Sequence, residues 1–131
     1  MNDKIVKIWL KYANDDLKAG VLLFNNDPDE FKSIVCYHME QAVEKYLKAY
    51  LIFNNKEINK THDITELIEN CKEIDIDFDN IYSFNANELT DYAVNMKYPS
   101  SSKVISLEDE KTAVSIANQV KSFVMEKIKN K

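Results

Sequence analysis

Apolar residues recur every three or four positions over most of the chain, and this spacing is typical of amphipathic helices. The pattern predicts a first helix over residues 3–24, ended by Asn25-Asn26. A second helix is predicted to run to Phe53, because Asp27 can cap it and Pro28 suits its first position. Glu30 follows three residues after Asp27 and would complete a capping box.

The second predicted helix is apolar on almost all sides. Its polar side chains form one narrow stripe, made of Gln41, Glu44, Lys45 and Lys48. A helix patterned in this way is expected to be buried centrally, with the stripe facing a shared cleft or a partner. The alternative is a solvated face with ion pairs, since Glu44 and Lys48 are spaced to pair within one helix.

A third, shorter helix is predicted to begin near Thr61-His62-Asp63, where either Thr61 or Asp63 can cap it. Asp63 would form a capping box with Glu66. Residues 74–78 alternate apolar and polar side chains, but a single five-residue strand would have no strand to pair with. We therefore expect an extended loop that packs Ile74, Ile76 or Phe78 on the helices.

A fourth helix is predicted over residues 80–96, and Pro99 fixes its end. The last helix follows Ser106 as its cap, with Glu108, Asp109 and Glu110 in the first turn and lysines in the last, an order that the helix dipole favours. These elements predict an all-α fold, an antiparallel helical bundle of four long helices plus one short helix. The length of the chain, 131 residues, predicts a single domain over residues 1–131.

Composition narrows the function classes. The chain has 17 lysines, 22 acidic residues and no arginine, so its net charge is −5. Without arginine it lacks the planar guanidinium group that binds a phosphate through two parallel hydrogen bonds. An acidic chain does not favour a general phosphate-binding surface, although a local patch can still bind nucleic acid. No apolar run approaches the ~20 residues needed to span a bilayer, and the start does not resemble a signal sequence. We expect a cytoplasmic protein without a membrane segment.

Three parts of the sequence contain candidates for chemistry. Asp16 falls on or beside the buried side of the first helix, where a carboxylate needs a partner or a function; a bond to a lysine, a tyrosine or the backbone is the structural interpretation. His62, at a helix start, is expected to cap or to hydrogen-bond and not to catalyse. Lys97 and Tyr98, with Tyr92, could clamp a phosphate and stack a base, or could simply end a helix. Metal-ligand spacing is absent, so no metal or other cofactor is expected.

Several of these residues together resemble one family. The quoted elements are Trp9-x3-Ala13-x2-Asp16-Leu17-x-Ala19, Gln41-Ala42-x-Glu44-Lys45-x-Leu47-Lys48-Ala49, Thr61-His62-Asp63-x3-Leu67 and Lys97-Tyr98-Pro99. In this order and spacing the chain resembles the HEPN domain family of bacteria and archaea. The resemblance implies a helical bundle that is usually dimeric and often encoded beside a small nucleotidyltransferase, as a toxin–antitoxin or nucleotide-binding pair. It also implies a second class, because many other members are metal-independent ribonucleases.

One departure separates the two classes. Ribonuclease members carry an arginine followed four to six residues later by a histidine, whereas here Lys97 stands at the matching place and no histidine follows. The missing imidazole would remove acid–base catalysis usually worth about two to four orders of magnitude. We therefore expect no catalytic residues, and a homodimer that pairs with a small nucleotidyltransferase protein and binds a nucleotide or RNA. The expected ligand-binding residues are Asp16, Gln41, Lys45, Lys48, Lys97 and Tyr98. The alternative is a metal-independent ribonuclease toxin with a divergent site, using Asp16, Asn95, Lys97 and Tyr98.

Overall fold

The computed structural model describes residues 3–58, 60–89 and 104–129. Its elements are α1 (Asp3–Asn26), α2 (Lys32–Phe53), α3 (Ile64–Lys72), the 3-10 helices η1 (Ile76–Phe84) and η2 (Ala86–Leu89), and α5 (Leu107–Lys129). No strand occurs in these residues, which confirms the predicted all-α fold. Among the helices described, none is long and apolar enough to cross a membrane.

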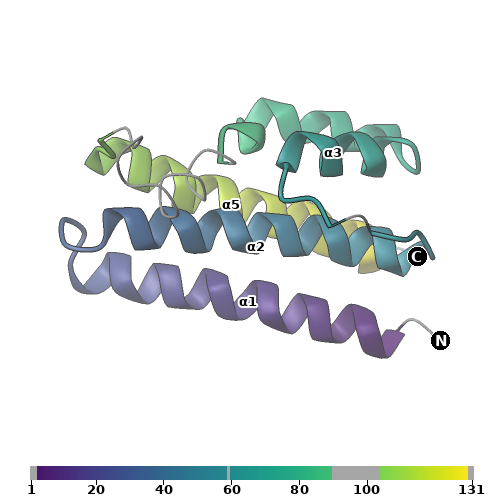
Figure 1. Cartoon of the computed structure of the whole chain (residues 1–131), viewed down its shortest axis with the longest axis horizontal. Helices are drawn as coiled ribbons and strands as arrows, with labels where there is room; N and C mark the ends of the chain where they lie inside the picture. The colour runs from purple at the N-terminus through teal and green to yellow at the C-terminus, as the bar shows by residue number, and fades with distance from the viewer. Residues whose placement is uncertain (1–2, 59, 90–103, 130–131) are drawn as a thin grey trace.

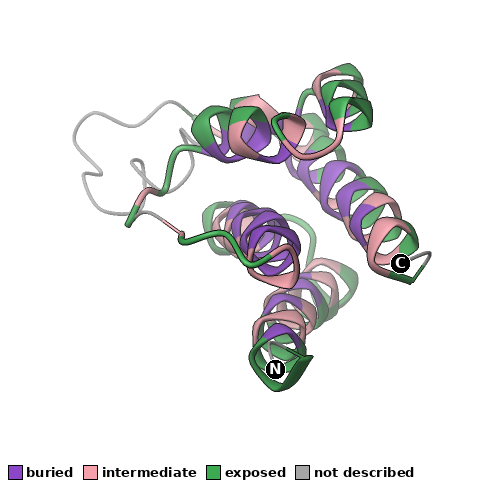
Figure 2. Cartoon of the chain, turned by 90° about the vertical axis from the view of Figure 1, so that its right-hand side faces the viewer, coloured by how far each residue is buried: buried purple, intermediate pink, exposed green. Residues whose placement is uncertain are grey.

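The other elements surround α2 (Figure 1). α1 runs antiparallel to α2 along one side, as the bundle pattern predicts, and α5 lies along another side. α5 runs in the same direction as α2, because the chain returns through η1 and η2 in between. α3, η1 and η2 cover a third side of the bundle (Figure 2). Each neighbour thus covers a different part of α2.

The predicted central burial of α2 is confirmed. Between Met39 and Leu51, every residue except Gln41 and Lys45 is buried. At the contact with α1, a Cβ added to Gly20 would overlap Met39 Cε and lie 3.3 Å from His38 Cβ. Glycine therefore allows α1 to approach α2 closely. Aromatic rings join the remaining layers: Tyr50 and Phe78 are tilted against one another at a centroid distance of 4.3 Å, and Phe78 meets Phe123 edge-to-face at 5.0 Å.

The predicted start of α2 is wrong. Residues 27–31 precede the helix, which begins at Lys32 without a side-chain cap. The Asp27 carboxylate instead accepts a hydrogen bond from the Asp29 N–H at 3.2 Å, and the Asp27 carbonyl accepts from the Glu30 N–H at 3.3 Å. Aspartate readily bonds the backbone two residues on, and here this local turn uses the group that was expected to cap α2.

The start of α3 follows one of the two predicted alternatives. The Asp63 carboxylate caps the helix by accepting from the Thr65 N–H at 3.0 Å, while Thr61 Oγ1 accepts from the Asp63 N–H at 3.1 Å. The extended loop expected at residues 74–78 is wrong, because η1 begins at Ile76. Asp75 starts it by accepting from the Asp77 N–H.

Within residues 74–78, Phe78 is buried and enters the core. Ile76, by contrast, is 69% exposed. Of the predicted fourth helix, residues 80–89 form 3-10 turns and not an α-helix, interrupted at Asn85 by a left-handed φ of 63°. Asn95, Lys97, Tyr98 and Pro99 lie outside the described residues.

The predicted cap of the last helix is confirmed, and it is reciprocal. Ser106 Oγ accepts from the Asp109 N–H, and Asp109 Oδ2 accepts from the Ser106 N–H, each at 3.0 Å. Glu110, expected only to favour the helix dipole, is fully buried. Neither of its carboxyl oxygens has a hydrogen-bond partner in the part of the chain that the structure describes.

Candidate functional site

Asp16 joins the polar stripe of α2 to α1. His38 Nδ1 lies 2.9 Å from Asp16 Oδ1, and the Lys45 ammonium donates to Asp16 Oδ2. The structural interpretation of Asp16 as a partner of a lysine is thereby confirmed. Burial raises the pKa of Asp16, but the hydrogen bonds with His38 and Lys45 outweigh burial and lower the pKa overall. Asp16 is therefore an ionised hydrogen-bond acceptor at neutral pH.

Glu44, next to Lys45 in α2, organises a second cluster. Its buried carboxylate lies 2.8 Å from His62 Nδ1 and 3.5 Å from Lys48 Nζ, which confirms the predicted Glu44–Lys48 pair. The expected hydrogen bonding of His62 is confirmed as well. The Lys48 ammonium also lies 5.8 Å from the centroid of the Trp9 ring, so a cation and an aromatic ring meet at this edge.

Glu40 lies between the two clusters and was missed from the sequence. It is fully buried, with Oε1 accepting from Gln41 Nε2 at 2.6 Å. Its Oε2 is buried without a partner among the described residues. Burial, and secondarily the Glu44 carboxylate, raises the pKa of Glu40 to about 8. Glu40 is thus largely protonated at neutral pH, and the four-residue spacing from Glu44 was the signal available in the sequence.

The structure brings together only part of the predicted site. Asp16 and Lys45 are in contact, and Lys48 lies one turn along α2 beside Trp9. Gln41 donates to Glu40, and the side chains that bond Asp16 among the described residues are His38 and Lys45. Lys97 and Tyr98 lie outside the described residues. Sequence reasoning also missed three contacting side chains: His38, Trp9, and Asn14, which accepts a hydrogen bond from the Tyr46 hydroxyl.

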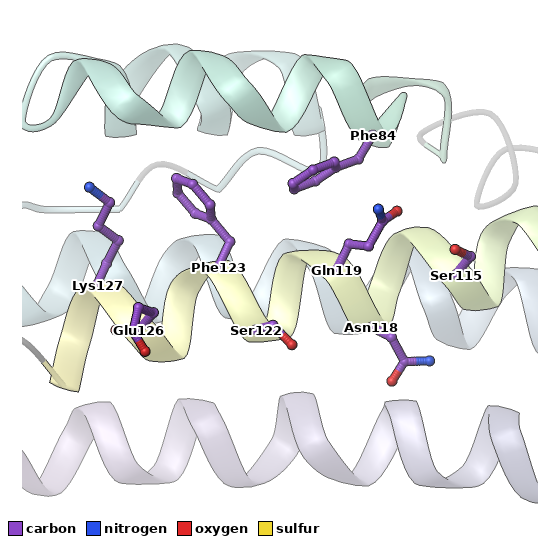
Figure 3. A pocket seen from close by; sticks show the side chains of 8 residues that line it. All are labelled: Phe84, Ser115, Asn118, Gln119, Ser122, Phe123, Glu126 and Lys127. Atoms are coloured by element: carbon purple, nitrogen blue, oxygen red, sulfur yellow. The ribbon is translucent and has the colours of Figure 1, made fainter.

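A separate groove of about 740 Å³ lies along α5. Figure 3 shows Phe84 and Phe123 facing one another above α5, while Asn118, Ser122 and Glu126 point to the other side. Lys127 at one end of the groove is held by Asp75 and Asp77 at 2.7 Å each, so its charge is already matched. None of the predicted site residues lines this groove. In the described residues, no group of three acidic, histidine or cysteine side chains could hold a metal ion.

The comparisons with known proteins identify a family and a similar fold. The HEPN domain model matches residues 6–128. The crystal structure of an archaeal HEPN homologue has a TM-score of 0.73 with 21% sequence identity, over 94% of this chain and 97% of that one, a likeness that bears on the fold alone. No curated protein matches the chain. Since the family model covers nearly the whole sequence, this protein belongs to the HEPN domain family.

Proposed function

We propose that this HEPN protein acts by binding: as a homodimer, it pairs with a small nucleotidyltransferase in a toxin–antitoxin-like system and holds a nucleotide where α1 meets α2. Membership of the family supports a role related to nucleotides or RNA in general. The observation that carries the proposal is the Lys48 ammonium beside the Trp9 ring. A base can stack on an indole while a neighbouring ammonium attracts phosphate.

The charges of this edge define how a nucleotide would bind. Lys45 is paired with Asp16, and Lys48 is paired with Glu44. A phosphate must therefore compete with two carboxylates for these ammonium groups, because each is already close to a negative charge. We expect weak binding in which stacking on Trp9 contributes much of the affinity.

Calorimetric titration with AMP and ATP tests the nucleotide part. Lys48→Met keeps most of the apolar stem and removes the charge, and it should raise the Kd about tenfold, as should Trp9→Leu. Lys129→Met, a matched change at an exposed lysine of α5, should bind as the wild type does. Wild-type affinity in Lys48→Met and Trp9→Leu, or no heat with either nucleotide, would remove this part of the proposal.

The partner and dimer parts have their own tests. Light scattering of the purified protein should give twice the mass of one chain. A small nucleotidyltransferase encoded beside this protein should co-elute with it after mixing, and separate elution contradicts the pairing.

One observation favours the ribonuclease alternative. His62 is exposed, its Nδ1 is bound to buried Glu44, and its Nε2 has no partner among the described residues. A histidine oriented by a carboxylate can act as a general base. Incubation with RNA in EDTA separates the two functions: cleavage that is lost in His62→Ala or Lys97→Ala supports the ribonuclease, and intact RNA supports binding.

A further inference from the structure

The outer side of α1 exposes an unusual amount of apolar surface. Ile5 and Ile8 are each 47% exposed, Tyr12 is 55% exposed and Leu22 is 62% exposed. Their spacing places them on one side of the helix, away from the buried side that contains Ala13 and Leu17. From Ile5 to Leu22 these side chains span about 25 Å along the helix, and the Lys11–Asp15 ion pair lies between Tyr12 and Leu22. Grouped apolar surface of this kind marks an interaction site more often than scattered residues do.

A groove of about 360 Å³ continues this surface between α1 and α5. Leu22 belongs to both, and the groove is lined by Leu17, Lys18, Val21, Leu22, Asn25, Asn118 and Lys121. Its lining therefore contains two lysines and no carboxylate. Neither Lys18 nor Lys121 forms an ion pair within residues 3–58, 60–89 and 104–129.

Further lysines extend the positive charge along α1. Lys4 and Lys7 are exposed and have no ion-pair partner in the part of the chain described, while Lys11 pairs with Asp15 at 2.8 Å. α1 itself carries four lysines and three aspartates, a local excess of one positive charge in a chain whose net charge is −5. An apolar stripe beside a lysine row is complementary to a surface that is both apolar and acidic.

An antiparallel contact between the α1 helices of two copies of this chain is disfavoured on this surface. In a two-fold contact the same patch meets itself. Two α1 helices packed antiparallel about such an axis keep each flank beside the equivalent flank of the copy. The lysine rows would then face one another, and this repulsion opposes the contact.

We propose that the outer side of α1 and the α1–α5 groove dock an acidic amphipathic helix of a different protein. This inference rests on the protein-partner part of the proposed function and specifies the chemistry of that partner. The 25 Å extent favours a helix over a small molecule, which would cover only the groove. The exposed isoleucine and leucine side chains favour protein over RNA, because RNA offers few apolar groups to cover them.

Two synthetic helical peptides of 24 residues provide the probe, one with leucine on one face and glutamate elsewhere, the other with lysine in place of glutamate. Fluorescence anisotropy with the full chain should show binding of the glutamate peptide only, weakening as salt is raised. Lys18→Glu/Lys121→Glu should weaken that binding at least tenfold, and Ile8→Ser/Leu22→Ser should weaken it too. The matched control Lys56→Glu/Lys60→Glu makes the same charge change in the loop after α2 and should have no effect.

Equal binding of both peptides, or full binding by Lys18→Glu/Lys121→Glu, overturns the inference. A single-stranded RNA that binds the wild type but not this variant, while the glutamate peptide fails, assigns the surface to RNA and also overturns it. Circular dichroism confirms that each variant is folded. The Kd of Lys18→Glu/Lys121→Glu for nucleotide should equal that of the wild type. Failure of the docking proposal therefore does not contradict nucleotide binding between α1 and α2, and failure of nucleotide binding does not contradict docking.

Discussion

Lysines lie on two sides of α1, toward α2 and toward α5, and they differ in whether a carboxylate lies beside them. Toward α2, Lys45 contacts Asp16 and Lys48 lies 3.5 Å from Glu44. Toward α5, Lys18 and Lys121 line a groove without a carboxylate. Burial explains the difference, since an ammonium removed from water needs a counter-charge and an exposed one does not. The first pair of lysines is therefore held by carboxylates of the fold, for which a ligand must compete, whereas the second pair has no carboxylate in its groove.

The largest effect is expected from neutralising Glu44. Glu44→Gln keeps the side-chain size but leaves the Lys48 ammonium, whose side chain is 8% exposed, without its negative partner. Breaking a buried pair from one side costs about 3 kcal/mol, and the variant should lose this amount of unfolding free energy in urea titration. A change too small to measure would show that the α1–α2 edge is solvated like the α5 side.

Asp15→Asn is the matched control for Glu44→Gln. Asp15 pairs with Lys11 at 2.8 Å, also four residues apart, but both side chains are more than half exposed. Exposed pairs contribute little because water already solvates both charges. The urea midpoint of Asp15→Asn should therefore match that of the wild type.

A smaller, pH-dependent effect is expected from Glu40. Its pKa is about 8 in the folded protein, against an ordinary value of 4.5, so the folded state holds its proton more tightly. At a pH between these two pKa values, Glu40 is ionised in the unfolded chain but still protonated in the folded protein. The stability that Glu40 contributes at low pH therefore declines as pH rises toward 8. Glu40→Gln cannot lose a proton, so its stability relative to the wild type should rise from pH 5 to pH 8. The gain is at most about 1.4 kcal/mol per pH unit.

Urea unfolding of both proteins at several pH values measures this gain. Glu57→Gln removes an equal charge from an exposed loop position and should show a difference that does not vary with pH. A flat difference for Glu40→Gln as well would mean that Glu40 ionises freely in the folded state.

Much of the fold was predictable because helix periodicity depends on short-range spacing. The central burial of α2 and the caps at Asp63 and Ser106 follow from residues within one or two turns. The start of α2 was not predicted, because Asp27 can either cap a helix or bond the backbone two residues on, and the local sequence is compatible with both. The 3-10 turns of η1 also escaped prediction, because burial of Phe78 against Tyr50 and Phe123 is a long-range contact.

The site was less predictable for the same reason. The stripe of α2 was visible in the sequence, but its partners come from other helices and loops: Asp16 and Trp9 from α1, and His62 from the start of α3. The spacing of apolar residues predicts which side of a helix is polar. It does not predict which side chains of a neighbouring element contact that polar side. Glu40 shows the limit most clearly, because its burial depends on the packing of every layer around α2.

The smallest effect on stability is expected from substitutions on the side of α1 that faces α5. A small effect there would most clearly distinguish this side from the side that faces α2. Lys18→Ala/Lys121→Ala removes two ammonium groups that have no counter-charge in the groove lining, so unfolding should cost the same within about 0.5 kcal/mol. The same variant should lose affinity for the acidic peptide. Loss of stability together with binding would mean that these lysines support the fold, as Lys48 does. Loss of binding alone would separate the two sides of α1 by function. Substitutions toward α5 would then change the affinity for the acidic peptide, whereas Glu44→Gln toward α2 would change the stability of the fold.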